Sequence, residues 1–120
     1  MPAPTKKDEL LPATPEQLLA LIERHRPSVF FAVPTIYVQL IRSVAETHLD
    51  LPMRFCGSAG ERLPSFVLDA WRELTGIELV DGIGSTETNY VVISNRPGAA
   101  VAGSAGTPVP GCEIRLVDDT

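Results

Sequence analysis

Apolar residues between positions 14 and 89 follow two periods, one typical of amphipathic helices and one typical of buried strands. Three stretches with helical spacing alternate with three short, mostly apolar runs. This alternation predicts an α/β fold with parallel strands joined by right-handed crossovers. The first run is apolar throughout, which predicts a strand covered on both faces and therefore a three-layer arrangement. The three runs are Val29–Val33, Met53–Cys56 and Ile77–Val80.

The first predicted helix has a well-marked start and stop. Thr14 is placed to cap it, Pro15 to occupy its first position and Gln17 to complete a capping box. The helix is expected to end near Arg26, because Pro27 disfavours helical geometry in the residue before it. Its predicted apolar face consists of Leu18, Leu21 and Ile22, with Leu19 beside them.

The second and third predicted helices both begin around a proline. The second starts at Pro34 and fades near residues 48–50, and the third opens at Leu63–Ser65. Gly76 is well placed as a left-handed cap at the end of the third helix. The predicted inward-facing residues are Tyr37, Leu40, Ile41 and Val44 in the second helix and Val67, Leu68, Trp71 and Leu74 in the third.

The end of the chain has no helical period. Tyr90–Ile93 predicts a fourth strand, Asn95–Gly98 predicts a turn, and Ala99–Gly111 is rich in Gly, Ala and Pro. Cys112–Val117 alternates between apolar and polar residues, which predicts a strand with one exposed face. The chain thus divides into a flexible N-terminus at residues 1–13, a parallel α/β segment at 14–89 and a β-rich segment at 90–120.

Composition and charge exclude several classes of protein. The chain is 44% hydrophobic and 21% charged, which is ordinary for a soluble globular protein. Its net charge of −5 and its lack of a basic cluster make nucleic acid and anionic membranes poor partners. No apolar run approaches the ~20 residues of a membrane span, and no apolar signal segment is visible, so we predict a cytoplasmic protein.

The cysteines and histidines are not predicted to form a functional site. Cys56 and Cys112 both fall in predicted strands, which favours buried, reduced thiols and leaves a disulfide as the alternative. His25 and His48 lie at or near predicted helix ends without a cluster of partners. We therefore expect them to be surface residues and not metal ligands.

Two glycine-bearing loops follow neighbouring predicted strands and carry the candidate chemistry. Gly57–Glu61 follows the second strand, and Asp81–Glu87 follows the third. In a parallel sheet both loops lie at the carboxyl edge, where such folds hold ligands, so we expect them to form one cleft. Glycine lets backbone approach a ligand closely. The hydroxyl of Thr86 beside the carboxylate of Glu87 suits a phosphate oxygen and its counter-cation.

Other interpretations of the second loop are weaker or stay open. Gly82-Ile83-Gly84 lacks the third glycine of a dinucleotide fingerprint, because Glu87 stands there and its carboxylate would repel a pyrophosphate. A Walker loop requires Gly-Lys, and the sequence has no lysine after Lys7. The open alternatives are a turn cap for Thr86, a solvated acid for Glu87 and a strand-end cap for Asp81.

Five motifs along the chain are specific when taken together: Val33-Pro34-Thr35-Ile36-Tyr37, Ser58–Pro64, Asp81–Glu87, Ser94–Gly98 and Gly103–Gly111. In residues, order and spacing they resemble the adenylate-forming acyl-CoA ligase superfamily, and most of all its benzoate-CoA ligase group. The resemblance covers nearly everything from Thr14 onward. It implies that the chain is part of the large N-terminal domain of such a ligase, with residues 14–89 as its nucleotide-binding segment.

The resemblance also implies roles for the residues of the two loops. It makes Thr86 a phosphate-binding residue and Glu87 a magnesium ligand, so both are candidate catalytic residues. Ile83 stands where the family commonly has a tyrosine, which leaves apolar contact without aromatic stacking. The implied adenine-binding residues are Ala59, Gly60 and Glu61 on one face and Asp81, Gly82 and Ile83 on the other face and edge. The implied acyl-pocket residues are Gly84, Asn89 and Tyr90.

The reaction implied by the resemblance uses ATP, magnesium and coenzyme A. A carboxylic acid, here favoured to be aromatic, is activated as acyl-AMP and transferred to coenzyme A. This chemistry needs charge stabilisation on several sides of the phosphate. The phosphate loop, the ribose-binding aspartate and the catalytic lysine of the family are not found in this sequence. We therefore expect no turnover by this chain alone.

An alternative from another class is a non-catalytic α/β module that binds a nucleotide or a partner chain. The predicted sheet would leave edges and apolar faces uncovered. Because exposed edges and apolar patches favour association, we also predict a homo-oligomer formed through them.

Overall fold

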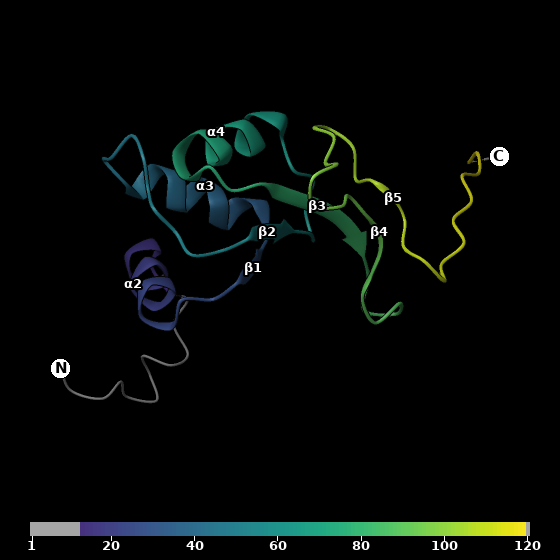
Figure 1. Cartoon of the computed structure of the whole chain (residues 1–120). Helices are drawn as coiled ribbons and strands as arrows, with labels where there is room; N and C mark the ends of the chain where they lie inside the picture. The colour runs from purple at the N-terminus through teal and green to yellow at the C-terminus, as the bar shows by residue number, and fades with distance from the viewer. Residues whose placement is uncertain (1–12, 120) are drawn as a thin grey trace.

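The computed structural model describes residues 13–119, which contain one five-stranded sheet with strand order β1-β2-β3-β4-β5 (Figure 1). Strands β1, β2 and β3 are parallel, whereas β4 and β5 join the sheet in antiparallel pairs. The strands are β1 Val29–Ala32, β2 Phe55–Ser58, β3 Leu79–Gly84, β4 Val91–Ser94 and β5 Thr107–Pro108. The helices are α2 Pro15–His25, α3 Pro34–Ser43 and α4 Ser65–Thr75. The predicted flexible N-terminus lies outside the described residues except for Ala13.

The ends of the helices follow the capping signals of the sequence. The backbone N–H of Thr14 donates to Gln17 Oε1 at 2.8 Å, and the N–H of Gln17 donates to Thr14 Oγ1 at 3.2 Å. These two bonds form the predicted capping box. Helix α2 ends before Arg26, and α4 ends at Gly76, whose φ of 70° is the left-handed conformation that glycine adopts without strain. Both predicted helix ends are confirmed.

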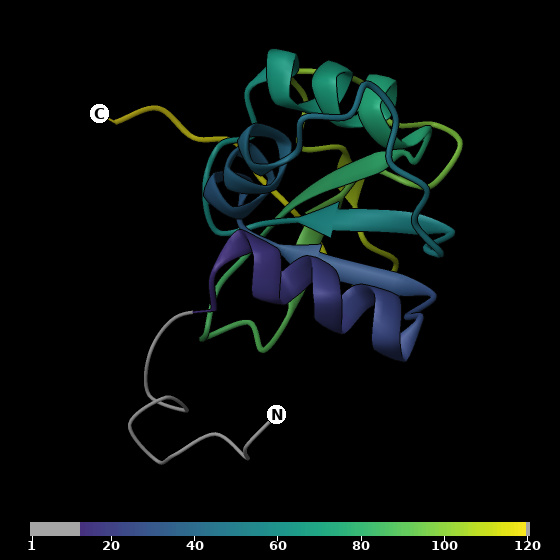
Figure 2. The ribbon, with the colours of Figure 1, turned by 90° about the vertical axis from the view of Figure 1, so that its left-hand side faces the viewer.

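All three helices lie on one face of the sheet (Figures 1 and 2). The strands β1, β2 and β3 follow in order, and consecutive parallel crossovers share one hand, so α3 and α4 reach the same face. The α/β class with parallel βαβ units is confirmed. Of the three predicted layers, residues 13–119 form two, which are the sheet and one layer of helices. The prediction that the first strand is covered on both faces is wrong, since Phe31 is 52% exposed.

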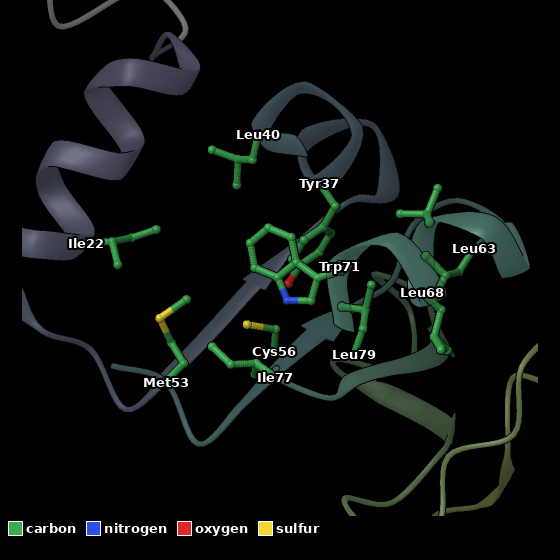
Figure 3. Close-up of a cluster of buried hydrophobic side chains, with 11 residues drawn as sticks. Ile22, Tyr37, Leu40, Met53, Cys56, Leu63, Leu68, Trp71, Ile77 and Leu79 are labelled. Atoms are coloured by element: carbon green, nitrogen blue, oxygen red, sulfur yellow. The ribbon is translucent and has the colours of Figure 1, made fainter. Parts of the chain in front are cut away.

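The core lies between the helices and the sheet and is centred on two aromatic side chains (Figure 3). The rings of Tyr37 and Trp71 meet edge to face with centroids 4.9 Å apart, and neither side chain has exposed surface. The Tyr37 hydroxyl donates to the carbonyl of Gly57 at 2.6 Å. Beside it, burial raises the pKa of the Cys56 thiol to about 11, so this thiol stays protonated at neutral pH. The buried cluster comprises Ile22, Tyr37, Leu40, Met53, Cys56, Leu63, Val67, Leu68, Trp71, Ile77 and Leu79.

Several element boundaries differ from the prediction. Helix α3 ends at Ser43, because Val44 is extended with ψ of 139°. Strand β2 begins at Phe55 instead of Met53 and runs to Ser58. Strand β3 continues to Gly84, so its last four residues belong to a strand and not to the predicted loop. Its extension pairs with β4, and although the sequence predicts a strand there, no local pattern shows that this strand pairs with residues 82–84.

The predicted strand at Cys112–Val117 is wrong. These residues form no strand in the structure, and Leu116 is 95% exposed. Alternation predicts a strand only where a partner strand is available, and residues 112–117 pair with none of the described strands. Cys112 is therefore half-buried outside any strand, whereas Cys56 is buried in β2, and both are free thiols.

The two histidines lie on the surface, as predicted. His25 is the last residue of α2, and His48 lies in the connection that follows α3. Among the helices of residues 13–119, none has the length and apolar character needed to cross a membrane.

Candidate functional site

A cleft of about 360 Å³ opens where the two predicted loops meet. One wall comes from the connection that leaves β2, and the floor comes from the second part of β3. The two strands are parallel neighbours with Ser58 opposite Asp81, so both carboxyl ends reach the same edge of the sheet. The residues around the cleft are Gly60, Glu61, Arg62, Leu63, Asp81, Gly82, Ile83, Gly84, Gly103 and Ala105.

Asp81 carries the most distinctive polar group of the cleft. Burial raises the pKa of its carboxyl group, and a hydrogen bond from the backbone of Gly82 opposes part of that shift. Its Oδ1 atom is buried and has no hydrogen-bond partner within residues 13–119. A buried acceptor without a donor costs ~1–3 kcal/mol, so an N–H group of a ligand would be favourable at this position.

Glu61 is held on the opposite wall by a contact from α3. The Thr35 hydroxyl donates to Glu61 Oε2 at 2.7 Å. Thr35 lies in the first turn of α3, where the helix dipole favours a negative charge. The loop after β2 is therefore tied to the start of the preceding helix, which fixes the wall of the cleft.

Thr86 and Glu87 lie at the tip of an exposed turn and do not line the cleft. The turn is closed by Thr88, whose hydroxyl donates to the carbonyl of Ser85 at 3.0 Å and to that of Tyr90 at 2.9 Å, one acceptor at a time. The turn follows directly from the end of β3, so it projects from the same sheet edge as the cleft. Thr86 and Glu87 therefore follow the cleft residue Gly84 closely in sequence. Because both side chains are exposed, a ligand can contact them.

No group of three or more metal-ligating side chains occurs in the part of the chain that the structure describes. Glu87 therefore offers one carboxylate and not a protein cage. Mg²⁺ commonly binds through one or two carboxylates together with waters and substrate phosphates. A single exposed carboxylate at this edge fits such a shared site, with most ligands supplied by phosphate and water.

The remaining predicted site residues do not gather in one place. Gly84 lies in the cleft, whereas Ala59 is half-buried and does not line it. Asn89 has a left-handed φ of 68° in the exposed turn. Tyr90 lines a second, smaller pocket of about 140 Å³. That pocket is bounded by Phe31, Ser58, Val80, Gly82, Tyr90, Val91, Ser94 and Val109.

The second pocket lies on the sheet face opposite the helices α2, α3 and α4. Phe31 and Val80 alternate along their strands with Phe30 and Leu79, which pack against or belong to the core, so they face the other side. Gly82 borders both the pocket and the cleft. The two hollows are therefore neighbours that share one backbone segment of β3.

Four residues of the cleft are absent from the predicted site. Arg62 and Leu63 continue the first wall, and the signal was present, because they belong to the same short motif as Glu61. Gly103 and Ala105 form a third wall, although their stretch has no periodic pattern and contains none of the predicted site residues. Only the return of the chain between β4 and β5 brings them to the cleft.

Comparisons with known proteins agree with this geometry. Residues 4–120 match the protein family described as AMP-binding enzyme. The benzoate–CoA ligase of Thauera aromatica is 39% identical over 107 residues, which are 88% of this chain and 20% of that protein. The anthranilate–CoA ligase of Pseudomonas aeruginosa is 43% identical over 105 residues, again 88% of this chain and 20% of the relative. The chain thus spans about a fifth of the length of these relatives.

Solved structures show the same likeness in three dimensions. A benzoate CoA ligase from Burkholderia xenovorans LB400 is 42% identical with a TM-score of 0.82, covering 89% of this chain and 22% of that one. An anthranilate CoA ligase solved in complex with anthranoyl-AMP is 41% identical with a TM-score of 0.82, covering 90% of this chain and 21% of that one.

Proposed function

Because this chain belongs to the AMP-binding enzyme family, we propose that its cleft holds the adenine end of an acyl-adenylate. The observation that carries the proposal is Asp81, which lines the cleft and whose buried Oδ1 has no hydrogen-bond partner within residues 13–119. An exocyclic amine of adenine supplies the N–H donor that this acceptor lacks. Gly60 and Glu61 form the facing wall, and the exposed side chain of Ile83 gives the base an apolar contact.

The phosphate end of the ligand is assigned to the turn after β3. The Thr86 hydroxyl donates to a phosphate oxygen, and the Glu87 carboxylate contributes a ligand to Mg²⁺. With the Glu87 carboxylate as one of its ligands, Mg²⁺ would supply neutralisation of the phosphate charge during formation of the acyl-adenylate. Both side chains lie in the turn that follows the end of β3, next in sequence to the strand residues that we assign to adenine binding.

The acyl group is assigned to the second pocket, next to Tyr90. Its volume of about 140 Å³ is close to that of apolar protein cavities that hold a benzene ring, ~150 Å³. Its walls are mainly apolar, and it adjoins the cleft at Gly82. Phe31 closes one side, since its ring lies directly over Gly57, where any side chain would collide with it. The pocket therefore fits a single-ring aromatic acid, and Gly84 lies against the backbone of its lining residues Tyr90 and Val91.

The whole reaction requires more than this segment. We propose that the parent activity is ATP-dependent activation of an aromatic carboxylic acid as acyl-AMP, followed by transfer to coenzyme A. The chain contributes adenine, acyl and part of the phosphate contacts. Among residues 13–119, Arg62 is the one basic side chain that lines the cleft, and the catalytic lysine of the family is not found in this sequence, so the 120-residue chain is expected to bind ligands without turnover.

Titration calorimetry with AMP tests the proposal on the chain as it stands. We expect saturable one-to-one binding, and Asp81→Ala is expected to weaken it about tenfold, because the acceptor for the adenine amine is lost. Asp69→Ala removes an exposed carboxylate on α4 and serves as the control, with unchanged affinity. Absence of AMP binding, or equal loss in both variants, would contradict the assignment. Sustained pyrophosphate release with ATP, Mg²⁺ and benzoate would contradict the expected lack of turnover.

We also propose that the chain self-associates through its helix-free sheet face. Phe31 and Tyr90 are exposed there, 52% and 67% respectively, beside the half-buried side chains of β4. Sedimentation velocity across a concentration series is expected to show a dimer or larger species at high concentration. A second series with Phe31→Ser should shift the distribution toward monomer, while compact monomer at all concentrations in the original chain would refute the idea.

A further inference from the structure

Residues 95–106 form a loop beside the cleft, and the two ends of this loop lie next to each other. It joins β4 to β5, and Ser94 at its start pairs with Thr107 at its end. Compact loops whose ends meet and whose own side chains fill their interior often carry function. Here Gly103 and Ala105 stand at the third wall of the cleft, so the shape of the loop decides the width of the binding site.

Asn95 fills the interior of this loop and is 6% exposed. Its Nδ2 group donates to the carbonyl of Ser104 at 2.6 Å, and its Oδ1 accepts from the N–H of Val101 at 3.1 Å. Its backbone N–H donates to the carbonyl of Asp81 at 2.9 Å, and Nδ2 also reaches that carbonyl at 3.4 Å. One residue therefore joins the floor strand of the cleft to the wall loop.

The closure of the loop also depends on a close backbone approach. Gly106 has a φ of 101°, which side chains other than glycine rarely allow, and a Cβ at this position would collide with the backbone of Ser94 and Asn95. Gly106, at the end of the loop, therefore lies against the backbone of Asn95, whose side chain fills the interior of the loop. Movement of Asn95 would be transmitted to both ends of the loop.

The outer part of the loop has a separate anchor. The Glu78 carboxylate accepts from the N–H of Gly98 at 2.7 Å and from the N–H of Ala100 at 3.3 Å. Neither of these two loop residues lines the cleft. Glu78 and Asn95 therefore hold the same loop at two points, one away from the cleft and one next to it.

We propose that Asn95 is a positioning residue that sets the distance between the Asp81 floor and the wall at Gly103 and Ala105, and that ligand affinity depends on it. The proposal rests on the proposed function only for the identity of the ligand. Asn95 itself does not line the cleft, so its effect on binding passes through the wall and the floor.

Amide hydrogen exchange on the ligand-free chain tests the placement directly. In Asn95→Ala we expect faster exchange at Val101 and across residues 103–106, because the loop loses its internal donor and acceptor. In the matched control Glu78→Ala, faster exchange is expected at Gly98 and Ala100 without a comparable change at 103–106. Unchanged exchange at 103–106 in Asn95→Ala would overturn the proposal. Asn95→Ser, which is smaller and still polar, repeats the test if the alanine variant does not fold.

Affinity for AMP separates positioning from general stability. We expect Asn95→Ala to weaken AMP binding about tenfold and Glu78→Ala by less than about twofold, even if their thermal midpoints fall equally. Parallel losses of affinity and midpoint in both variants would show that Asn95 acts only through stability and would overturn the proposal. If the unaltered chain does not bind AMP, the proposed function fails, and the exchange data alone decide whether Asn95 holds the wall.

Discussion

The two halves of this molecule are held together by different means. The half formed by β1–β3 and the three helices has a core in which Tyr37, Trp71 and Leu79 have no exposed surface. The half formed by β4, β5 and the loop 95–106 has a half-buried strand β4 and an exposed strand β5, and its loop depends on Asn95 and Glu78. Apolar burial spreads stability over many side chains, whereas these polar contacts concentrate it in two. The cleft lies at the boundary, so its geometry depends on both means at once.

The largest effect is expected from truncation in the helical half. Trp71→Ala should destabilise the fold by ~3–5 kcal/mol, because it opens a large cavity among Tyr37, Cys56 and their neighbours. Urea unfolding followed by circular dichroism measures the loss. Phe66→Ala on the same helix is the control, since that ring is 67% exposed. Similar losses for the two variants would show that the core is not organised as described.

A pH dependence of stability is the second expected effect and belongs to the same half. The Cys56 thiol has a pKa of about 11 in the fold against an ordinary value of 9.0, with desolvation as the main cause. Between pH 9 and 11 the unfolded chain releases a proton that the folded chain retains, so stability should fall as pH rises through this window. Denaturant unfolding at several pH values measures the slope, and Cys56→Ala should reduce it, while burial of Tyr37, which also raises the pKa of its hydroxyl, maintains part of the slope above pH 10. An equal slope in that variant would contradict the assignment.

A smaller effect is expected from a single hydroxyl group. Tyr37→Phe should cost ~0.5–1.5 kcal/mol, because the carbonyl of Gly57 in β2 loses a donor while the packing of the ring is kept. Tyr90→Phe is the matched control on the other half, where the side chain is 67% exposed. A loss in Tyr90→Phe as large as in Tyr37→Phe would erase the contrast between the halves.

The smallest effect is expected near the end of the chain. Leu116→Ser should change stability by less than ~0.5 kcal/mol, because this leucine is 95% exposed and packs against nothing that would be lost. The same unfolding assay measures it. A clear loss of stability would show that side chains of residues 112–117 are buried, as the strand predicted from the alternation requires.

The same contrast explains what the sequence allowed us to predict. The helical half has local signals, such as the capping box of Thr14 and Gln17 and the left-handed cap at Gly76, and these were confirmed. The two loops around Glu61 and Asp81 were predicted to share one cleft, and parallel pairing does bring them together. Periodicity and capping depend on neighbours in sequence, so they can be recognised without the fold.

The second half could not be predicted in the same way. The extension of β3 through Gly84 depends on β4, and the third wall at Gly103 and Ala105 depends on a loop closed by Asn95. The paired residues of β3 and β4 are seven to twelve positions apart, and Asn95 and Ser104 are nine apart, so the pattern around each residue does not identify its partner. The strand predicted at Cys112–Val117 is wrong for the opposite reason. The alternating pattern is present there, but no described strand pairs with it.

The division of β3 between two neighbours has a consequence for how the chain acquires its shape during synthesis. Its first residues pair with β2, which leaves the ribosome earlier, whereas Gly82 to Gly84 wait for β4 to emerge. Chains generally begin to fold from the N-terminal side as they are made. The helical half can therefore assemble first, and the cleft floor at Gly82–Gly84 is completed only after Ser94 has been added. A nascent chain halted before that residue would be folded in one half while the floor of its cleft still lacked a partner strand.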